Sequence, residues 1–207
     1  MFLTNLVIKS LCGFIAILPM VLIFQFVILK SKKNNNKTSV AYTIMTYLFC
    51  FFLAGMLSVT GIPSVLYSRV YINLNLIPFR DITYNFIQYI ENIILFIPFG
   101  LFLPLLWKKF ENPYITWTSG LLLSLAIEVS QLFNYRATDI DDLLMNTLGT
   151  IIGYLGFVVL KKAFPIMAVI FRQDDNWKSG REAYVYIIIS WIAMFLIQPY
   201  IENWVYS

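Results

Sequence analysis

Long apolar runs separated by short polar segments make up most of the chain. Six of these runs are long enough to cross a bilayer as helices. They cover residues 10–29, 40–60, 89–107, 114–133, 143–160 and 183–200. A helix rises about 1.5 Å per residue, so roughly 20 residues match a hydrocarbon core about 30 Å thick. The pattern predicts an all-α, polytopic membrane helix bundle of about six transmembrane helices.

Two further apolar stretches, residues 71–79 and 163–171, are too short to cross a bilayer. The first contains Asn75 and Pro78, and the second contains Pro165. Both stretches suit a position at the membrane interface. The first is alternatively a re-entrant segment, which requires that its free backbone groups face protein or water.

Composition supports the membrane assignment. Of the 207 residues, 59% are hydrophobic and 13% are charged, and the mean hydropathy is +0.74. Ordinary soluble domains carry about 45–50% apolar and about 25% charged residues. These values exclude such a domain, and the length leaves room for one membrane domain over residues 1–207.

Basic residues divide unequally between the two sides of the predicted bundle. With the amino terminus outside the cell, eleven basic residues lie in the inner loops and four lie on the outer side. This distribution follows the positive-inside rule, and it places both termini outside together with residues 61–88 and 134–142. The net charge of +4 gives no indication of nucleic-acid binding.

The residue types exclude some chemistry. The sequence has no His, which removes serine–histidine catalysis and the commonest ligand of zinc, copper or haem. Cys12 and Cys50 lie in separate apolar runs. They are predicted to be buried hydrophobic residues.

Polar residues gather near one predicted hairpin. Glu128 lies within the helix over 114–133, and Ser124 and Gln131 fall on the same helical face. A charged residue inside a membrane helix normally faces the bundle or a wet cavity. Two interpretations of Glu128 remain open, a structural hydrogen bond to another helix and a site that faces a ligand.

The segment after this helix adds one cation and three carboxylates. They are Arg136, Asp139, Asp141 and Asp142. Thr138 or Asp139 can cap the next helix, whose positive dipole end suits the acids that follow, and Arg136 can pair with Glu128. Alternatively, the cluster binds a divalent cation, or it holds a phosphate or carboxylate group beside Arg136.

The next helix continues the polar face. Asp142, Asn146, Gly149 and Gly153 follow one another at spacings of four, three and four. The glycines predict close packing against a neighbouring helix. Asn146 is then within reach of Gln131 or Glu128 across the hairpin.

The helix over 89–107 contains Pro98, Gly100 and Pro104 within seven residues. Proline removes a backbone donor and clashes with the preceding turn. These residues predict a kink in the helix or a break in its hydrogen-bond ladder, which leaves carbonyls free for polar partners. A bent bundle and a kinked transporter-type helix are both compatible with that pattern.

Four short motifs, which begin at Asn75, Glu91, Glu128 and Arg136, together resemble the VanZ-like family of bacterial membrane proteins. The resemblance covers about residues 73–153, so the helix over 183–200 is an addition to this core. The family takes its name from a protein that confers low-level resistance to the glycopeptide teicoplanin.

The resemblance implies a set of characteristic polar and turn residues, and no reaction comes with them. They are Asn75, Pro78, Phe79, Asn92, Glu128, Gln131, Arg136, Asp139, Asp142 and Asn146. It also implies a multi-pass protein of the bacterial cell membrane, in contact with membrane lipids.

The leading hypothesis is a non-enzymatic membrane protein that affects teicoplanin susceptibility. It would bind the drug or a lipid-linked cell-wall precursor at the outer face, without a cofactor. The second hypothesis is an enzyme acting on a lipid or wall precursor, with Glu128 or Asp139 as base or metal ligand. The third is a transporter, although the sequence shows no convincing inverted repeat.

Overall fold

The structure is a computed structural model of the 207-residue chain. It describes residues 2–31, 39–66, 68, 70, 72–80, 82–134, 138–172 and 179–207. The described helices and strands follow one another as α1 (Phe2–Ser31), α2 (Val40–Thr60), β1 (Leu74–Asn75), α3 (Ile82–Leu106), the 3-10 helix η1 (Lys108–Glu111), α4 (Pro113–Gln131), β2 (Thr138–Asp139), α5 (Ile140–Ala163), α6 (Pro165–Ile170), α7 (Ser179–Leu196) and α8 (Gln198–Tyr206).

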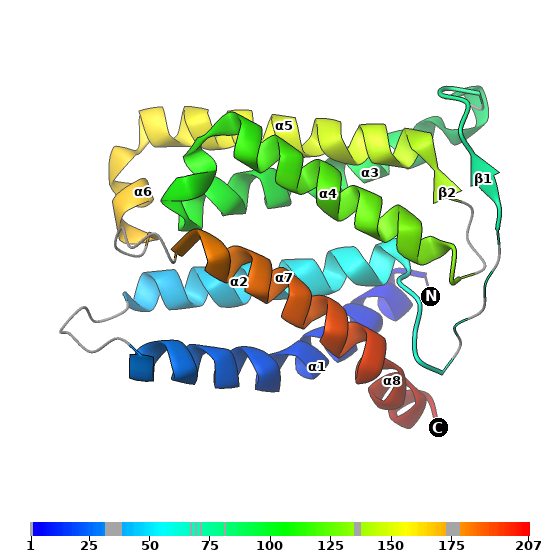
Figure 1. The fold of residues 1–207 in the computed structure, drawn as a ribbon, viewed down its shortest axis with the longest axis horizontal. Helices are drawn as coiled ribbons and strands as arrows, with labels where there is room; N and C mark the ends of the chain where they lie inside the picture. Colours follow the sequence, from blue (N-terminus) through cyan, green and yellow to red (C-terminus); the bar gives the residue numbers. More distant parts are fainter. Residues whose placement is uncertain are drawn as a thin grey trace.

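The long helices run along the long axis of the molecule, and α7 crosses them obliquely (Figure 1). Both chain termini lie at the same end of the bundle as β1 and β2, which we call the strand end. The opposite end, which we call the α6 end, carries α6. The segments that the charge distribution assigns to one side of the membrane therefore share one end of the bundle.

The predicted all-α bundle is confirmed, but the predicted number of six spans is not. Four described helices are long and apolar enough to cross a bilayer, and they are Val7–Val27, Val40–Thr60, Phe86–Leu106 and Ile140–Ala163. The pair Gly180–Leu196 and Gln198–Tyr206, bent by 45°, makes a fifth if it is one span. The chain turns at Ile197, so the helix predicted over 183–200 is interrupted there.

The sequence predicts that helix α4 crosses the membrane, but it is not among the described helices that are long and apolar enough to do so. Its 19 residues bury a face rich in hydroxyl side chains, together with one carboxylate and one amide. Polar side chains reduce the hydropathy of the helix because they serve contacts inside the protein rather than with lipid.

The two short apolar stretches take different forms. Residues 71–79 include β1, which pairs in parallel with β2 so that Leu74 lies opposite Thr138 and Asn75 lies opposite Asp139. Residues 163–171 include α6, whose Ile166 and Val169 are exposed. Because β1 and β2 come from connections far apart in the sequence, their pairing ties the two loops of the strand end together.

Helices α3 and α5 approach so closely that a methyl group does not fit between their backbones. A Cβ atom on Gly149 would lie 2.2 Å from the carbonyl oxygen of Ile93, and one on Gly153 would lie 2.0 Å from that of Ile97. From the other side, a Cβ atom on Gly100 would lie 2.0 Å from the carbonyl oxygen of Thr150. The predicted role of the α5 glycines in helix packing is confirmed.

Helix α3 continues through both prolines. It extends to Leu106, with Pro98 and Pro104 inside it. The predicted kink stays a prediction, but the two prolines do not divide α3, which packs tightly against α5. Gly100 serves this packing.

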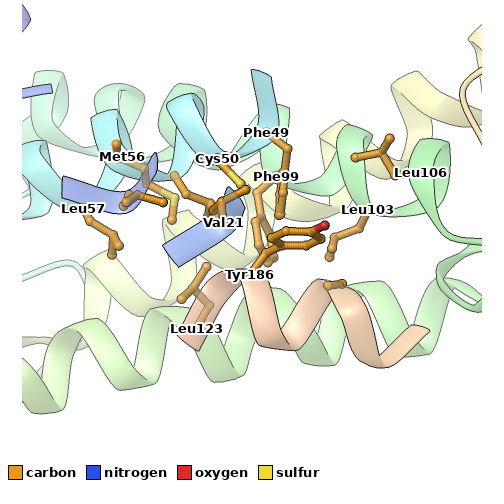
Figure 2. Close-up of a cluster of buried hydrophobic side chains, with 14 of the residues drawn as sticks. Val21, Phe49, Cys50, Met56, Leu57, Phe99, Leu103, Leu106, Leu123 and Tyr186 are labelled. Carbon is orange, nitrogen blue, oxygen red and sulfur yellow. The ribbon is translucent and has the colours of Figure 1, made fainter. Parts of the chain in front are cut away.

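The apolar core joins α1, α2, α3, α4 and α7 (Figure 2). Phe49 of α2 is fully buried in this core, with a ring centroid 5.4 Å from that of Trp107 in an edge-on arrangement. Tyr186 of α7 and Phe99 of α3 pack in the same cluster. Cys12 and Cys50 are buried free cysteines, as predicted.

A small ion cluster closes the α6 end. Glu111 accepts hydrogen bonds from Lys161, at 2.8 Å, and from Arg172. Partial burial opposes ionisation of Glu111, but these two cations outweigh that effect and lower the pKa of its carboxyl. The cluster connects η1 to the end of α5 and to the segment after α6.

We expect Gly153→Ala to lower the thermal stability of the purified protein in detergent, by about 1–3 kcal/mol, because the added methyl overlaps backbone of α3. Gly156→Ala is the matched control on the same helix. Its Cβ would lie 3.8 Å from the nearest atom, a side-chain carbon of Leu101. This control should unfold at the same temperature or slightly higher, since Ala favours helix over Gly. Equal melting of the two variants would contradict the close-packing account.

The Glu111 cluster predicts a pH-dependent contribution to stability. A lowered pKa in the folded state stabilises the protein above the ordinary carboxyl pKa of 4.5, and this stabilisation is lost as the pH falls through the folded-state value. Wild type should therefore melt above Glu111→Gln at neutral pH, and the difference should shrink below pH 4.5. A difference that stays constant from neutral to acid pH would contradict the ion-pair origin.

Candidate functional site

Polar residues from four helices surround a cavity at the strand end. Its volume is about 70 Å³. The lining residues come from the last turn of α2, the first half of α3, the last turns of α4 and the first turns of α5. They are Val59, Thr60, Gln88, Glu91, Asn92, Leu95, Ile127, Glu128, Gln131, Asp142 and Asn146.

The α4 wall carries the predicted polar stripe. Ser124, Glu128 and Gln131 are all buried, because positions three and four residues apart share the helix face that packs against α5. The Gln131 side chain donates from Nε2 to the carbonyl oxygen of Thr60, at 3.1 Å, so it also ties α4 to the end of α2.

Glu128 links this wall to the start of α5. Its Oε2 accepts a hydrogen bond from the backbone N–H of Asp139 at 2.9 Å, and its carbonyl oxygen accepts one from Oγ1 of Thr138 at 3.0 Å. Glu128 also lines the cavity. Both interpretations of Glu128 drawn from the sequence are therefore compatible with the structure, since the residue makes a structural hydrogen bond and also lines the cavity.

Asp139 is the N-cap of α5. Its Oδ1 accepts from the backbone N–H of Asp141 at 2.9 Å, which satisfies one of the free donors of the first turn. Its Oδ2 accepts from Nδ2 of Asn75 at 3.1 Å, across the β1–β2 pair. The predicted cap is confirmed with Asp139, rather than Thr138, in this position.

Asp141 holds the loop before α3. Both of its carboxylate oxygens accept from the backbone N–H of Phe79, at 2.9 and 3.1 Å, and Oδ2 accepts from the hydroxyl of Tyr89 at 2.6 Å. Phe79 has a φ of 59°, a left-handed conformation that is strained for a bulky residue. The carboxylate offsets this strain by binding the amide that the conformation presents.

Asp142, the next residue, lines the cavity. Its Oδ1 accepts from Nδ2 of Asn92 at 2.6 Å and from Nε2 of Gln88 at 3.0 Å. Its place in the first turn of α5 also puts the charge near the positive end of the helix dipole. Two consecutive aspartates therefore serve two functions, one binding the loop and one lining the cavity.

Asn146 lies one turn further along α5 and joins α5 to α4. Its Nδ2 donates to Oγ of Ser124 at 2.9 Å. Glu128 and Gln131, the partners considered for it from the sequence, line the same cavity. The predicted facing of the α4 and α5 stripes is therefore confirmed, with Ser124 as the bonded partner.

The structure brings most of the predicted site residues together. Those that line the cavity are Asn92, Glu128, Gln131, Asp142 and Asn146. Asn75 and Asp139 bind each other beside it. Arg136 lies outside the described residues, so its pairing with Glu128 and its binding of an anion stay predictions.

Sequence reasoning missed the contribution of α3 before Asn92. Gln88 and Glu91 line the cavity, and Tyr89 binds Asp141. The one available signal was their spacing, because Gln88 and Asn92 lie four residues apart on one face of a helix. Nothing in the local sequence indicated that this face meets the start of α5.

Several side chains near the cavity are of the types that can bind a metal ion. Among the described residues, no group of three or more His, Cys, Asp or Glu side chains is placed to hold a metal ion. The carboxylates of Asp139, Asp141 and Asp142 accept hydrogen bonds from amides, a phenol and backbone N–H groups. A divalent cation at this cluster stays a prediction.

The fold and the cavity define a polytopic helical membrane protein with a polar site at one end of the bundle. The sequence model of the VanZ/LLP1 family matches residues 14–161, and the chain belongs to this family. The match includes α2 and most of α1, so it begins well before the core of residues 73–153 expected from the motifs. It ends before α7 and α8.

The chain is similar to a curated relative, the protein VanZ of Enterococcus faecium. The two are 44% identical over 86 residues, which are 41% of this chain and 50% of the relative. The chain therefore spans about half the length of the curated relative that it matches. No solved structure matches this chain.

We expect Tyr89→Phe to loosen the loop before α3, because the hydroxyl donates to the buried carboxylate of Asp141. Hydrogen–deuterium exchange of the purified protein should become faster in residues 72–80 and stay unchanged in α7. The control is Tyr154→Phe, which removes a hydroxyl that donates to the carbonyl of Glu111 at the α6 end. Unchanged exchange in residues 72–80 of Tyr89→Phe would contradict the role given to Asp141.

Proposed function

We propose that this VanZ-like membrane protein affects susceptibility to teicoplanin. It does so by holding a polar group of a lipid-linked cell-wall precursor, or of the drug itself, in the strand-end cavity. The proposal combines the family membership with the position of the cavity. The resistance role comes from the family resemblance, and the cavity supplies the means of recognition.

The observation that carries the proposal is a polar cavity that reaches the surface of the bundle. Its rim includes Val59 of α2, which is 41% exposed, and the exposed Glu91 of α3. Both residues lie on membrane-crossing helices. A molecule anchored in the surrounding lipid can therefore present its polar end to the cavity without leaving the membrane.

Size restricts what enters the cavity. Pockets for drug-sized ligands are about 300–1,000 Å³, whereas this cavity is about 70 Å³. A whole glycopeptide is far too large for it, and a terminal group of a larger molecule fits. The lipid-linked precursor is therefore the occupant that the geometry favours over the drug.

The charge distribution supports a position of the cavity at the outer face of the membrane. The strand end carries the cavity, both termini and the segments assigned outside by the basic residues. Glycopeptides act on wall precursors outside the cell. The proposed orientation therefore places the cavity where precursor and drug meet.

The test measures the inhibitory concentrations of teicoplanin and vancomycin in a susceptible Gram-positive host that expresses the chain. We expect wild type to raise the inhibitory concentration of teicoplanin alone and Glu128→Gln to return it to the level of the empty vector. The control is Ser190→Ala, a buried α7 hydroxyl bonded within its own helix, which should protect like wild type. Membrane levels are matched by immunoblot.

Two results would overturn the proposal. No protection by wild type at full membrane abundance would remove the resistance role. Full protection by Glu128→Gln at matched abundance would separate that role from the cavity.

A further inference from the structure

Two amide oxygens in the cavity wall have no hydrogen-bond donor among the described residues. They are Oε1 of Gln131 and Oδ1 of Asn146. Both side chains are almost fully buried, at 3% and 1% exposure, and both line the cavity. An acceptor that is buried without a donor is unfavourable, so each of these oxygens calls for a partner.

The NH₂ groups of both amides make hydrogen bonds inside the protein. Gln131 donates from Nε2 to the carbonyl oxygen of Thr60, an atom that can only accept, which fixes the orientation of this amide. Asn146 donates to Oγ of Ser124 on α4. The two oxygens are left for whatever occupies the cavity, and a partner for them must carry N–H or O–H groups.

We propose that the cavity binds a small hydrogen-bond-donating group, a hydroxyl or a primary ammonium, at the end of a membrane lipid headgroup. This inference rests on the proposed function, because it names the chemistry of the lipid-linked group that the cavity takes. An ionised phosphate has acceptor oxygens only and cannot satisfy the two amides. The phosphate of such a lipid would therefore stay outside the cavity.

The volume agrees with a terminal group. One water molecule needs about 10–15 Å³ of cavity volume, and the cavity has about 70 Å³. A hydroxyl or ammonium on one or two carbons fits within that space, and a sugar ring with its substituents does not. The carboxylates of Glu91, Glu128 and Asp142 add further acceptors to the lining.

The experiment compares lipids in pairs of equal charge. The purified full chain in detergent is titrated with short-chain phospholipids, and binding is followed by native mass spectrometry. Phosphatidylethanolamine is paired with phosphatidylcholine, whose quaternary ammonium has no N–H. Phosphatidylglycerol is paired with phosphatidylmethanol, whose headgroup has no O–H. Each pair changes the hydrogen-bond donors while the net charge stays the same.

We expect at least a fivefold preference for the donor lipid in one pair or both. A preference in the first pair identifies an ammonium, and one in the second identifies a hydroxyl. Asn146→Leu keeps the approximate size of the side chain but removes its acceptor, so it should abolish the preference, as should Gln131→Leu. Ser190→Ala should retain it, since that hydroxyl is bonded within α7.

Equal binding within both pairs would overturn the inference, and so would a preference that survives in folded Asn146→Leu and Gln131→Leu. Thermal melting of each variant in the same detergent establishes that it is folded. The outcome is independent of the resistance test. Donor-lipid preference without teicoplanin protection would remove the proposed function alone, whereas protection without any preference would remove this inference alone.

Discussion

The close approach of α3 and α5 is the constraint on which the rest of the site depends. Gly149 and Gly153 leave no space for a side chain between the two backbones. Because the helices lie this close, amide and phenol side chains on α3 reach the carboxylates of Asp141 and Asp142 at the start of α5. A wider separation would leave those acids buried without donors, which is costly in a low-dielectric interior.

The start of α5 shows how three neighbouring acids can be accommodated inside a membrane protein. Asp139 caps the helix, Asp141 binds the loop before α3, and Asp142 accepts from amides in the cavity. Each carboxylate has its own donors, and all three lie at the positive end of the helix dipole. The cavity walls are therefore positioned by hydrogen bonds before any ligand binds.

The residues matched by the family and the residues that line the cavity lie in the same part of the chain. Every residue that lines the cavity, from Val59 to Asn146, falls within the matched residues 14–161. Helices α7 and α8 lie beyond the match. Helix α7 contributes Tyr186 to the apolar core and none of the residues that line the cavity, so it supports the bundle without lining the cavity.

The sequence by itself determined the class of the fold and much of the site. Apolar runs of membrane-spanning length predict helices because each buried backbone group must be bonded within its own segment, and the spacing of Glu128, Gln131 and Asn146 predicts polar faces on α4 and α5. Only the tertiary structure decided which α3 residues meet them, that Asp141 binds the loop, and that α3 passes through its prolines. Those outcomes depend on contacts between segments some fifty or more residues apart, such as Asn92 with Asp142, and local periodicity has no information about such contacts.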